Sequence, residues 1–526
     1  MKVLISDALS ENGVKILRDS GLDVDVNTKL SNEELQGKIA QYNGLVIRSA
    51  TKVNEKVIEA ATNLRVIGRA GSGVDNVDLS AATKRGIVVM NTPGGNTITT
   101  AEHAFAMMLA LARKIPQATA SMKAGKWEKS KFMGMELQEK VLGIIGLGQI
   151  GSYLVKLAQG ASMKVIANDP YLAEDRAHEM GVELVSLSEL YRRADILSLH
   201  TTMTSETKHM IGVEAINQMK DGVRIVNCAR GGLVDESALV EALTSGKVAG
   251  AAFDVFEKEP CAPDHPLLGL DNMIFTPHIG ASTTEAQESV AISIAEQVVE
   301  YLTRGVARGA VNMPSVPVEL LQRIQPYLSL AEKLGVLQSQ LCEGGIERVT
   351  IEYKGDVANE SVALITPVVL KGLLSPILED TVNNVNSLVI AKERGIEVKE
   401  VRSRDAGDFA SLIRVMVDAS KKSATVTGTL FGRKDPRVVE VNHFEVDFDP
   451  RGHLLFILNE DQPGVIGMVG RIVGEHGINI ARMECARVGQ GGVALLILSL
   501  DSQAPDAVLD TIRNGTNIQF AKCLQL

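Results

Sequence analysis

Short apolar runs alternate with amphipathic stretches along the first 97 residues. The runs KVLISD, GLVIRSA, RVIGRA and GIVVMN favour strands, and the stretches NEELQGKIAQY and NEKVIEAAT favour helices. Strands separated by helices at this spacing predict a parallel, doubly wound sheet. Residues 97–124 carry the longest helical pattern, with a threonine cap and a break near Pro116. We expect this helix to lead into a second domain.

The same alternation returns in the next segment of the chain. Six strand-like runs, from KVLGIIG to NMIFTPH, have helical patterns between them and predict one Rossmann-type domain. The amphipathic stretch from Thr283 to about Arg304 predicts a helix that returns the chain to the first domain. We therefore expect a discontinuous first domain, residues 1–97 and 288–316, and a second domain of residues 98–287.

Two further units are expected after Asn312. The proline-containing stretch MPSVPVEL is typical of a linker. Residues 317–451 have an α/β pattern without a chemical motif. Residues 452–526 follow the order βαββαβ, which predicts a ferredoxin-like unit.

Composition limits the classes of function. The chain has 526 residues, of which 45% are apolar and 22% charged, so it can form several globular cores. A net charge of −10 without a block of basic residues argues against nucleic-acid binding. No signal-peptide pattern and no long apolar run occurs, so we expect a cytoplasmic protein that binds no membrane. Five scattered cysteines without a CxxC pair support neither disulfides nor a metal site.

The segment KVLGIIGLGQIGSYLVKLAQ has the spacing of a dinucleotide-binding turn. We expect Gly146 to allow a tight turn, Gly148 to let a pyrophosphate approach the backbone, and Gly151 to let helix and strand pack closely. Asp169 ends the next strand, where a carboxylate accepts both ribose hydroxyls and repels a 2′-phosphate. The unit predicts dinucleotide binding, with NAD favoured over NADP, against the alternative of a plain βα turn.

Arg230 lies in NCARGGLVDE, just past the end of a later strand of the same predicted sheet. Ligands bind at this edge of open α/β sheets. Taken alone, the arginine is equally compatible with a surface ion pair to Asp235 or Glu236.

The next two strand ends carry further polar groups. AAFDVFEKEP contains Asp254 and Glu259, and NMIFTPHIGAST contains His278. A planar cation can hold a carboxylate in two-point fashion, an imidazole can move a proton, and a carboxylate can orient the imidazole. Together with Arg230 these residues predict acid–base chemistry beside a nicotinamide.

Four motifs, GLGQIG, NCARGGLVDE, DVFEKEP and PHIGAST, resemble in type and order those of the D-isomer-specific 2-hydroxyacid dehydrogenases. The resemblance covers residues 7 to about 312. It implies NAD as the cofactor and Arg230, Glu259 and His278 as catalytic residues. The cofactor-binding residues expected from the motifs and this resemblance are Gly146, Gly148, Gln149, Ile150, Gly151, Asp169, Thr201, Cys228, Ala229, Arg230, Asp254, His278, Gly280 and Ala281, with Asp254 at the nicotinamide amide.

VIRSATKV and GRAGSGVDNVD, together with the C-terminal unit, resemble the long phosphoglycerate dehydrogenases within that family, over nearly the whole chain. In this group basic residues of the first domain hold the substrate phosphate, which implies that role for Arg48 and Arg69. Both also end adjacent predicted strands. The other substrate candidates are Gly71, Ser72 and Gly73, through backbone N–H groups, and Lys129 and Lys131, in the same chain or across a dimer.

The unit that begins at NEDQPGV resembles an ACT domain, and residues 317–451 then resemble the intervening domain of the long form. The resemblance implies L-serine as an effector, with Asn459, Asp461 and Asn479 as its ligands. An unliganded dimerisation module is the alternative.

We therefore expect an α/β protein with two doubly wound parallel-sheet lobes, an intervening α/β domain and a ferredoxin-like ACT domain. The expected reaction is the NAD-dependent oxidation of 3-phospho-D-glycerate to 3-phosphohydroxypyruvate, the first step of serine biosynthesis, by a homodimer or homotetramer. One alternative is another D-2-hydroxyacid dehydrogenase, such as a glyoxylate or hydroxypyruvate reductase, which has no need of Arg48 and Arg69. The other is an NAD-sensing regulatory protein, which needs binding but no turnover.

Overall fold

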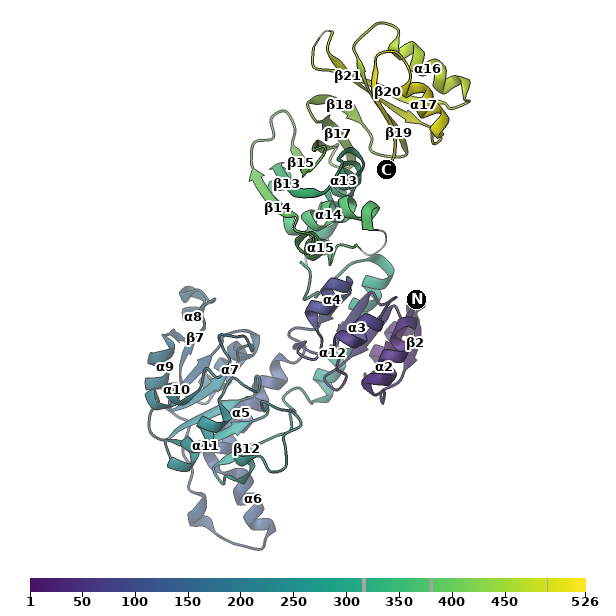
Figure 1. The fold of residues 1–526 in the computed structure, drawn as a ribbon. Helices are drawn as coiled ribbons and strands as arrows, with labels where there is room; N and C mark the ends of the chain where they lie inside the picture. Colours follow the sequence, from purple (N-terminus) through teal and green to yellow (C-terminus); the bar gives the residue numbers. More distant parts are fainter. Residues whose placement is uncertain (315–317, 379–381, 490) are drawn as a thin grey trace.

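The computed structural model describes residues 1–314, 318–378, 382–489 and 491–526. The molecule is elongated, with the C-terminal unit and the N-terminal lobes at opposite ends (Figure 1). Its parts follow one another along the long axis in the order C-terminal unit, third unit, first lobe and second lobe. None of the described helices is both long and apolar enough to cross a membrane.

The first lobe is a parallel sheet with helices packed on it. Its strands have the order β2-β1-β3-β4-β5, which is a doubly wound arrangement. The strands are β1 (Lys2–Ile5), β2 (Asp23–Val26), β3 (Gly44–Ile47), β4 (Val66–Arg69) and β5 (Val88–Asn91). The helices are α1 (Glu11–Asp19), α2 (Asn32–Lys38), α3 (Glu55–Ala60), α4 (Leu79–Arg85) and, much later in the chain, α12 (Thr284–Arg304).

Helix α12 joins the first lobe as its amphipathic pattern predicts. Thr283 caps it by accepting a hydrogen bond from the Ala286 N–H. Its apolar face packs on β3, β4 and β5 and beside α1. A Cβ on Gly68 would lie 2.7 Å from Val298, so the glycine lets the helix approach the sheet closely.

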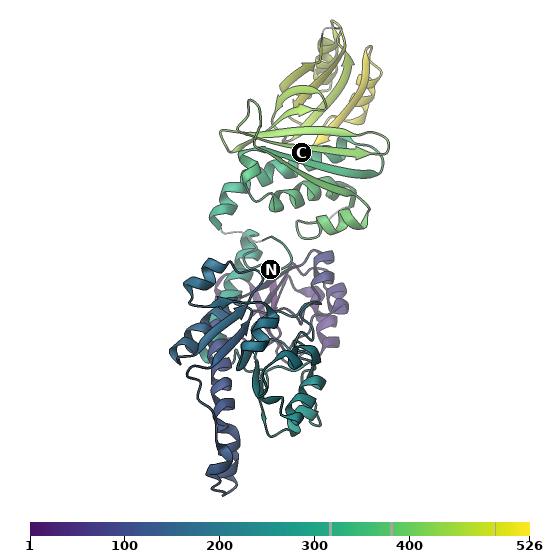
Figure 2. The same cartoon turned by 90° about the vertical axis from the view of Figure 1, so that its left-hand side faces the viewer.

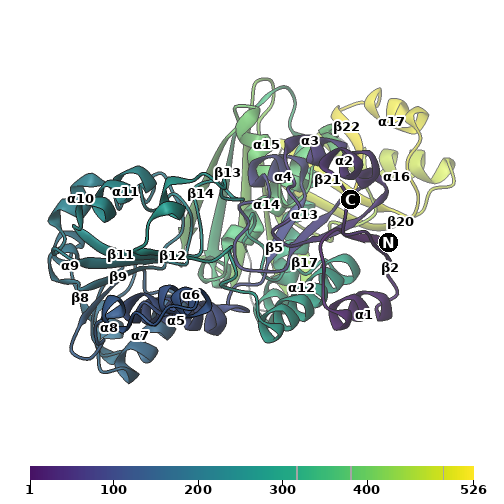
Figure 3. The ribbon, with the colours of Figure 1, turned by 90° about the horizontal axis from the view of Figure 1, so that it is seen from below.

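The second lobe is a larger parallel sheet with the order β12-β11-β10-β9-β6-β7-β8. Its strands are β6 (Val141–Ile145), β7 (Lys164–Asn168), β8 (Glu183–Leu184), β9 (Ile196–Leu199), β10 (Val223–Asn227), β11 (Val248–Phe253) and β12 (Met273–Phe275). Its helices are α5 (Thr97–Arg113), α6 (Ile115–Lys123), α7 (Gln149–Gly160), α8 (Glu174–Glu179), α9 (Leu187–Arg193), α10 (Val213–Gln218) and α11 (Glu236–Ser245). Figure 3 shows α9, α10 and α11 on one face, and α5 and α7 on the other. The strand order reverses between β6 and β9, where such sheets bind ligands.

Three details of this lobe differ from the sequence prediction. The two-residue strand β8 extends the sheet to a seventh strand. The predicted single helix of residues 97–124 is two helices, because Lys114 has a left-handed backbone with φ +53°. Pro116 lies in the first turn of α6, where no N–H is needed. Asn96, not a threonine, caps α5, and its side chain makes no capping hydrogen bond. Helix α6 projects away from the body of the lobe (Figure 2).

The third unit has a six-stranded mixed sheet with the order β14-β13-β15-β16-β17-β18. Its strands are β13 (Ile346–Gly355), β14 (Glu397–Ser403), β15 (Ser411–Ala419), β16 (Ala424–Phe431), β17 (Asp435–Val441) and β18 (Phe444–Phe448), and its helices are α13 (Val318–Leu341), α14 (Val362–Leu378) and α15 (Ser387–Glu393). Helices α13 and α14 pack closely at two glycines. A Cβ on Gly335 would lie 2.2 Å from the Val369 oxygen, and one on Gly372 would lie 2.2 Å from the Glu332 oxygen.

The C-terminal unit has the predicted βαββαβ order and an antiparallel sheet, β20-β21-β19-β22. Its elements are β19 (His453–Glu460), α16 (Val465–Glu475), β20 (Ile480–Arg487), β21 (Val493–Leu500), α17 (Asp506–Arg513) and β22 (Ile518–Gln525). Helices α16 and α17 cover one face. Leu454, Phe456 and Ile497 on the other face belong to the apolar core of the third unit. Phe456 packs edge to face on Phe448 of β18 with ring centroids 5.7 Å apart, so the two units share one core.

Candidate active site

A cavity of about 560 Å³ lies between the first and second lobes, at the carboxyl ends of strands of both sheets. Arg48 and Arg69 reach it from β3 and β4 of the first lobe. Arg230, Glu259 and His278 reach it from the second lobe. The structure thus brings together the three expected catalytic residues and both expected phosphate-binding arginines.

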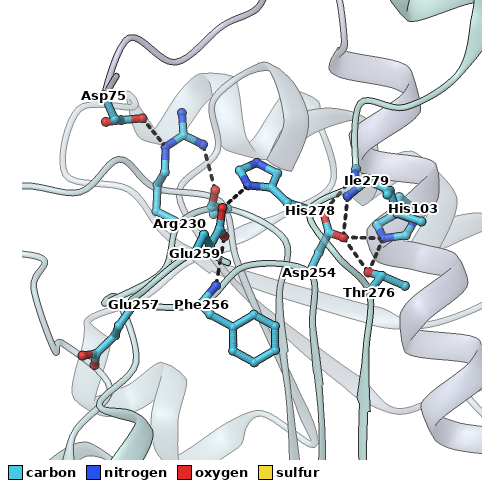
Figure 4. A network of polar contacts seen from close by, with 12 residues as sticks. Asp75, His103, Arg230, Asp254, Phe256, Glu257, Glu259, Thr276, His278 and Ile279 are labelled. Carbon is cyan, nitrogen blue, oxygen red and sulfur yellow. Dashed lines mark hydrogen bonds and ion pairs between the residues drawn. The ribbon is translucent and has the colours of Figure 1, made fainter. Parts of the chain in front are cut away.

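His278 and Glu259 form a hydrogen-bonded pair in this cavity (Figure 4). The distance from His278 Nδ1 to Glu259 Oε2 is 2.7 Å. An ionised carboxylate can only accept, so Nδ1 carries the hydrogen and Nε2 is left to accept a proton. The Phe256 N–H donates to the other Glu259 oxygen at 3.1 Å and orients the carboxylate.

The pair perturbs the titration of both its members. The hydrogen bond to Glu259 raises the pKa of His278, although burial opposes the shift. Burial alone would raise the pKa of Glu259, but the hydrogen bond and charge of His278 outweigh it and hold that pKa below its ordinary value. This is the arrangement of a general acid–base group with a carboxylate that stabilises its protonated form.

Arg230 reaches across the cleft to the first lobe. Its Nε donates to Asp75 Oδ2 at 3.0 Å, and its Nη1 donates to the Ala229 carbonyl at 2.8 Å. A Cβ on Gly73 would lie 2.2 Å from Arg230 Nη2, so the guanidinium rests against this glycine. Asp75 is 70% exposed, and its carboxylate occupies a position on Arg230 that an anionic ligand could take.

The alternative surface pairing of Arg230 is excluded by the geometry around it. Asp235 caps α11 by accepting from the N–H groups of Ser237 and Ala238. Glu236 accepts from the Glu257 N–H at 2.8 Å and contacts the His265 ring at 2.9 Å. Neither carboxylate pairs with Arg230 in the described structure.

Arg48, Arg69 and Arg230 make one wall of the cavity cationic. Burial lowers the pKa of Arg69 to about 10, and the positive charge of Arg230 adds to the shift, yet the guanidinium stays protonated at neutral pH. Arg69 Nε is buried and has no hydrogen-bond partner among the described residues. An anion bound here would therefore meet the guanidinium of Arg69, whose Nε is free, within the described part of the chain, to donate a hydrogen bond to it.

We expected the turn of Gly71, Ser72 and Gly73 to bind an anion through its backbone N–H groups, and only part of it can do so. Gly71, Ser72 and Gly73 all line the cavity. The Gly71 N–H, however, donates to Thr92 Oγ1 at 2.9 Å and therefore does not face an anion. Gly71 has φ +146°, and a Cβ there would lie 2.2 Å from Arg69 Nη1. The absence of a side chain at Gly71 therefore makes room for the guanidinium of Arg69.

Lys129 and Lys131 do not reach the cavity of their own chain. They lie in a short 3-10 helix, Lys129–Phe132, beyond α6. Lys131 Nζ pairs instead with Glu128 at 2.6 Å.

The glycine-rich turn between β6 and α7 lies beside the cavity, and its three glycines have different surroundings. A Cβ on Gly146, whose φ is +94°, would lie 2.7 Å from the His200 oxygen, and one on Gly151 would lie 2.1 Å from the Gly146 oxygen. A Cβ on Gly148 would meet no protein atom within 4 Å. The space next to Gly148 is therefore open at the N-terminus of α7, where backbone N–H groups favour a phosphate.

The other expected cofactor residues fall into two groups. Asp169 accepts from the N–H groups of Leu147 and Tyr171 and so ties β7 to the glycine turn. Gln149 Oε1 accepts from Thr97 Oγ1 at 3.0 Å. The cavity itself is lined by Ile150, Thr201, Cys228, Ala229, Arg230, Asp254, His278, Gly280 and Ala281.

Asp254, which we expected at the nicotinamide amide, lines the cavity and is also bound firmly within the protein. Its side chain is 1% exposed, and it accepts hydrogen bonds from the Ile279 and Gly280 N–H groups and from Thr276. Both carboxylate oxygens are thus engaged inside the protein. The sequence reasoning also missed Asp75 and His103. The available signal for His103 was its position as a polar residue on the apolar helix TAEHAFAMMLALAR.

The expected effector residues are not all together in one chain. Asn459 and Asp461 lie at the end of β19, and Asp461 pairs with Arg487 at 3.1 Å. Asn479 precedes β20 and donates to Asp501 at the opposite end of the sheet. At about 3.3 Å per residue along β20, Asn479 and Arg487 are roughly 25 Å apart. Among the described residues, no cluster of His, Cys, Asp or Glu side chains is arranged for a metal ion.

Comparisons with known proteins agree with this geometry. Residues 105–280 match the NAD-binding domain of D-isomer-specific 2-hydroxyacid dehydrogenases, residues 323–442 the D-3-phosphoglycerate dehydrogenase intervening domain, and residues 453–514 the ACT domain. Among solved structures, a D-lactate dehydrogenase from Aquifex aeolicus complexed with NAD and lactic acid is 30% identical, with a TM-score of 0.54. The match covers 60% of this chain and 100% of the D-lactate dehydrogenase chain. A glyoxylate reductase from Paecilomyes thermophila is 28% identical, with a TM-score of 0.55, over 59% of this chain and 98% of that chain.

Curated relatives match over the whole length. A D-3-phosphoglycerate dehydrogenase from Archaeoglobus fulgidus is 46% identical over 100% of both chains. One from Bacillus subtilis is 42% identical over 100% of this chain and 99% of its own. The chain therefore belongs to the D-3-phosphoglycerate dehydrogenases of the D-isomer-specific 2-hydroxyacid dehydrogenase family.

Proposed function

We propose that the protein oxidises 3-phospho-D-glycerate to 3-phosphohydroxypyruvate with NAD, the first step of serine biosynthesis. The observation that carries the proposal is one cavity that holds both an acid–base pair, His278 and Glu259, and three arginines. One arginine suffices for the carboxylate of a small hydroxy acid. Arg48 and Arg69 supply the additional positive charge that a phosphate requires.

The residues present fit NAD. The open space at Gly148 and the free N-terminus of α7 suit a pyrophosphate, and Asp169 lies at the end of β7, where its charge disfavours a 2′-phosphate. When bound, NAD accepts a hydride from the substrate. The remaining chemistry falls to side chains of the protein.

Arg230 holds the substrate carboxylate and C2 oxygen in this mechanism. Its Nη2 has no partner in the described hydrogen-bond network, and its Nε is paired only with the exposed Asp75. A substrate carboxylate can displace Asp75 and bind the guanidinium in two-point fashion.

His278 Nε2 takes the proton of the C2 hydroxyl as the hydride leaves C2. Glu259 stabilises the imidazolium that forms, because the pair is already hydrogen bonded through Nδ1. Proton transfer of this kind typically contributes about 10²- to 10⁴-fold to the rate.

We also propose a homodimer or homotetramer with a regulatory C-terminal unit. The projecting helix α6 and the exposed Trp127 and Met133 beyond it support contact with a second copy, which would carry Lys129 and Lys131 towards the partner's cavity. L-serine is the proposed effector. Because Asn459 and Asp461 lie at the opposite end of the sheet from Asn479, one serine can meet all three only if two copies pair their C-terminal units.

We further propose four domains. The start of α5 at Thr97 supports a second domain of residues 98–287 inserted into residues 1–97 and 288–316. Helix α12, which packs on the first lobe, begins at Thr284 and so crosses the second of these boundaries. Units of residues 317–451 and 452–526 follow.

The decisive test is the oxidation of NADH with 3-phosphohydroxypyruvate, compared with glyoxylate and hydroxypyruvate. We expect the phosphorylated substrate to give the highest kcat/KM, and replacement of Arg48 and Arg69 by glutamine to lower only that value strongly. Preference for an unphosphorylated substrate would instead indicate a sister dehydrogenase. Nucleotide binding without turnover of any of the three would indicate an NAD sensor.

A further inference from the structure

The acid–base histidine has an unusual backbone. His278 has φ +55°, in the left-handed region that residues with a Cβ rarely adopt. Its N–H donates to the Asp254 carbonyl at 2.8 Å, and the next two N–H groups, of Ile279 and Gly280, each donate to the Asp254 carboxylate at 2.8 Å. Asp254 therefore holds three successive N–H groups and keeps the imidazole turned towards Glu259.

Asp254 is itself held by two further side chains (Figure 4). Thr276 Oγ1 lies 2.5 Å from Asp254 Oδ1. His103 Nε2 lies 3.1 Å from Thr276 Oγ1 and 3.3 Å from Asp254 Oδ1. The threonine has one hydroxyl hydrogen, which it donates to the carboxylate, so it must accept from the histidine. His103 Nε2 therefore carries a hydrogen and donates to both groups.

His103 comes from an element that carries none of the catalytic loops. It lies on α5, which packs against β11 and β12, the strands that lead to Asp254 and Thr276. Asn96 and Thr100 lie on the same face of the helix, seven and three residues earlier. Asn96 Oδ1 accepts from Ser72 Oγ of the substrate turn at 2.6 Å, and its Nδ2 donates to Thr100 at 3.3 Å. One face of α5 thus contacts the substrate turn and the His278 loop.

We propose that His103 is a positioning residue of the dehydrogenase reaction. Its Nε2–H, through Thr276 and Asp254, keeps the left-handed His278 aligned with Glu259 and the substrate. The inference rests on the proposed function, in which His278 is the acid–base group. It gives His103 no contact with substrate or cofactor.

Two variants of nearly equal size separate donation from packing. His103→Gln keeps an N–H donor near Asp254, and we expect its kcat to stay within about threefold of wild type. His103→Leu fills the same space without a donor, and we expect kcat to fall about 10- to 100-fold, because a shift of about 1 Å in a catalytic group can cost about 10²-fold. Glu102→Gln, on the exposed neighbouring position of α5, is the control and should match wild type.

A second readout does not depend on turnover. NMR titration of the labelled histidine rings, with the His278 signal assigned from its absence in His278→Gln, reports the pKa of His278 directly. Glu259, Asp254 and Arg230 are the charged groups that face His278, and all three residues are present in both variants at position 103, so a change in the pKa of His278 reports a change in their arrangement. We expect the pKa to fall towards its ordinary value in His103→Leu, as the contact with Glu259 loosens, and to be restored in His103→Gln.

The outcomes are distinct. The proposal is overturned if His103→Leu, with its fold intact by circular dichroism, keeps the wild-type kcat and His278 pKa, or if the glutamine and leucine variants lose both equally. Loss of NADH affinity in His103→Leu with kcat unchanged would also overturn it, because the effect would then lie on the cofactor. A wild-type protein that fails to turn over 3-phosphoglycerate would count against the proposed function, whereas the titration would still decide whether His103 positions His278.

Discussion

At the scale of individual side chains, the pairing of His278 with Glu259 leads us to predict how the activity depends on pH. Oxidation requires neutral His278, and Glu259 raises its pKa, so activity should be lost as the pH falls through that raised value. In Glu259→Gln the pKa of His278 should be lower, and the acidic limb of the kcat/KM profile should move to lower pH. The maximum rate should also fall, because glutamine cannot stabilise the imidazolium by charge. An unmoved limb would show that another group titrates.

Arg230 makes a second prediction, about geometry rather than charge. Arg230→Lys keeps the positive charge but loses the planar fork that binds a carboxylate at two points. We expect kcat/KM to fall about 10- to 100-fold, which corresponds to a charged hydrogen bond of about 1.5–3 kcal/mol. Steady-state kinetics with 3-phosphoglycerate measure the loss, and near wild-type activity would return Arg230 to a structural role.

A substitution of Asp75, which lies on the first lobe, tests the same contact with Arg230 from the other side of the cleft. Its carboxylate binds Arg230 and repels an anionic substrate, so Asp75→Asn should lower the KM for 3-phosphoglycerate several-fold. The neutral amide keeps the size of the side chain. An increased KM would mean that Asp75 contributes to substrate binding.

The sequence could predict which chemical groups meet in the cavity and that a carboxylate orients His278, but not the partners of Arg230 and Asp254. Arg230, Glu259 and His278 follow strand ends of one sheet, and parallel strands bring such ends to one edge. The pairing of Arg230 with Asp75 depends on the closure of two lobes, which no local pattern encodes. The engagement of Asp254 with the 276–280 loop also could not be foreseen, because it depends on the left-handed turn at His278.

At the scale of the elements, the glycine turn between β6 and α7 offers a variant that should weaken cofactor binding without lowering the stability of the fold. Gly148→Ala places a methyl group in open space, so the melting temperature should not change, whereas a bound pyrophosphate would be displaced. We expect the Kd for NADH, measured by fluorescence titration, to rise about 10-fold or more, the cost of a charged hydrogen bond of about 1.5–3 kcal/mol.

Gly160→Ala is the control for this variant. Gly160 is the last residue of the same helix, and a Cβ there also meets no atom within 4 Å. Its Kd for NADH should equal that of wild type. Equal effects of the two alanines would place the effect in the helix rather than at a phosphate site.

Strong periodicity made most elements predictable, and weak or interrupted signals account for the differences. Alternating strands and helices identified both parallel sheets, and the βαββαβ order identified the C-terminal unit. Strand β8 has only two residues, too few to carry a pattern. The break between α5 and α6 lies at Lys114, where a left-handed residue separates two segments that share one helical pattern.

At the scale of the whole molecule, the sequence pattern predicts two separate units after residue 316, whereas in the structure these two units are joined. The third and C-terminal units share an apolar core, and Lys522 and Gln525 bond to Gln340 of α13. Side-chain periodicity shows that each sheet has a buried face but not what covers it, so this shared core could not be predicted. The solved D-lactate dehydrogenase covers only 60% of this chain, which shows that the two lobes occur without these units.

A truncation test follows from this division. A chain that ends at Pro314 should fold, turn over 3-phosphoglycerate and ignore L-serine, whereas the full chain should be inhibited by serine at millimolar concentration. The two are compared by initial rates with and without serine. Inhibition of the truncated chain, or indifference of the full chain, would contradict regulation through the C-terminal part.

Removal of residues 453–526 alone should behave differently. It would expose Phe448, whose ring packs on Phe456, together with the rest of the shared core. We expect a lower melting temperature and aggregation, which size-exclusion chromatography detects, although the active-site lobes are untouched.

Helix α5 has 17 residues and is about 25 Å long at 1.5 Å per residue. Its first turn lies at the passage between the lobes, His103 lies in its second turn, and its far end leads into the projecting α6. The helix that carries His103 against the Asp254 and Thr276 side chains therefore also connects, through the left-handed Lys114, to the projecting α6. The alignment of the acid–base histidine and any contact made at α6 thus depend on neighbouring helices of one continuous segment, residues 97–123.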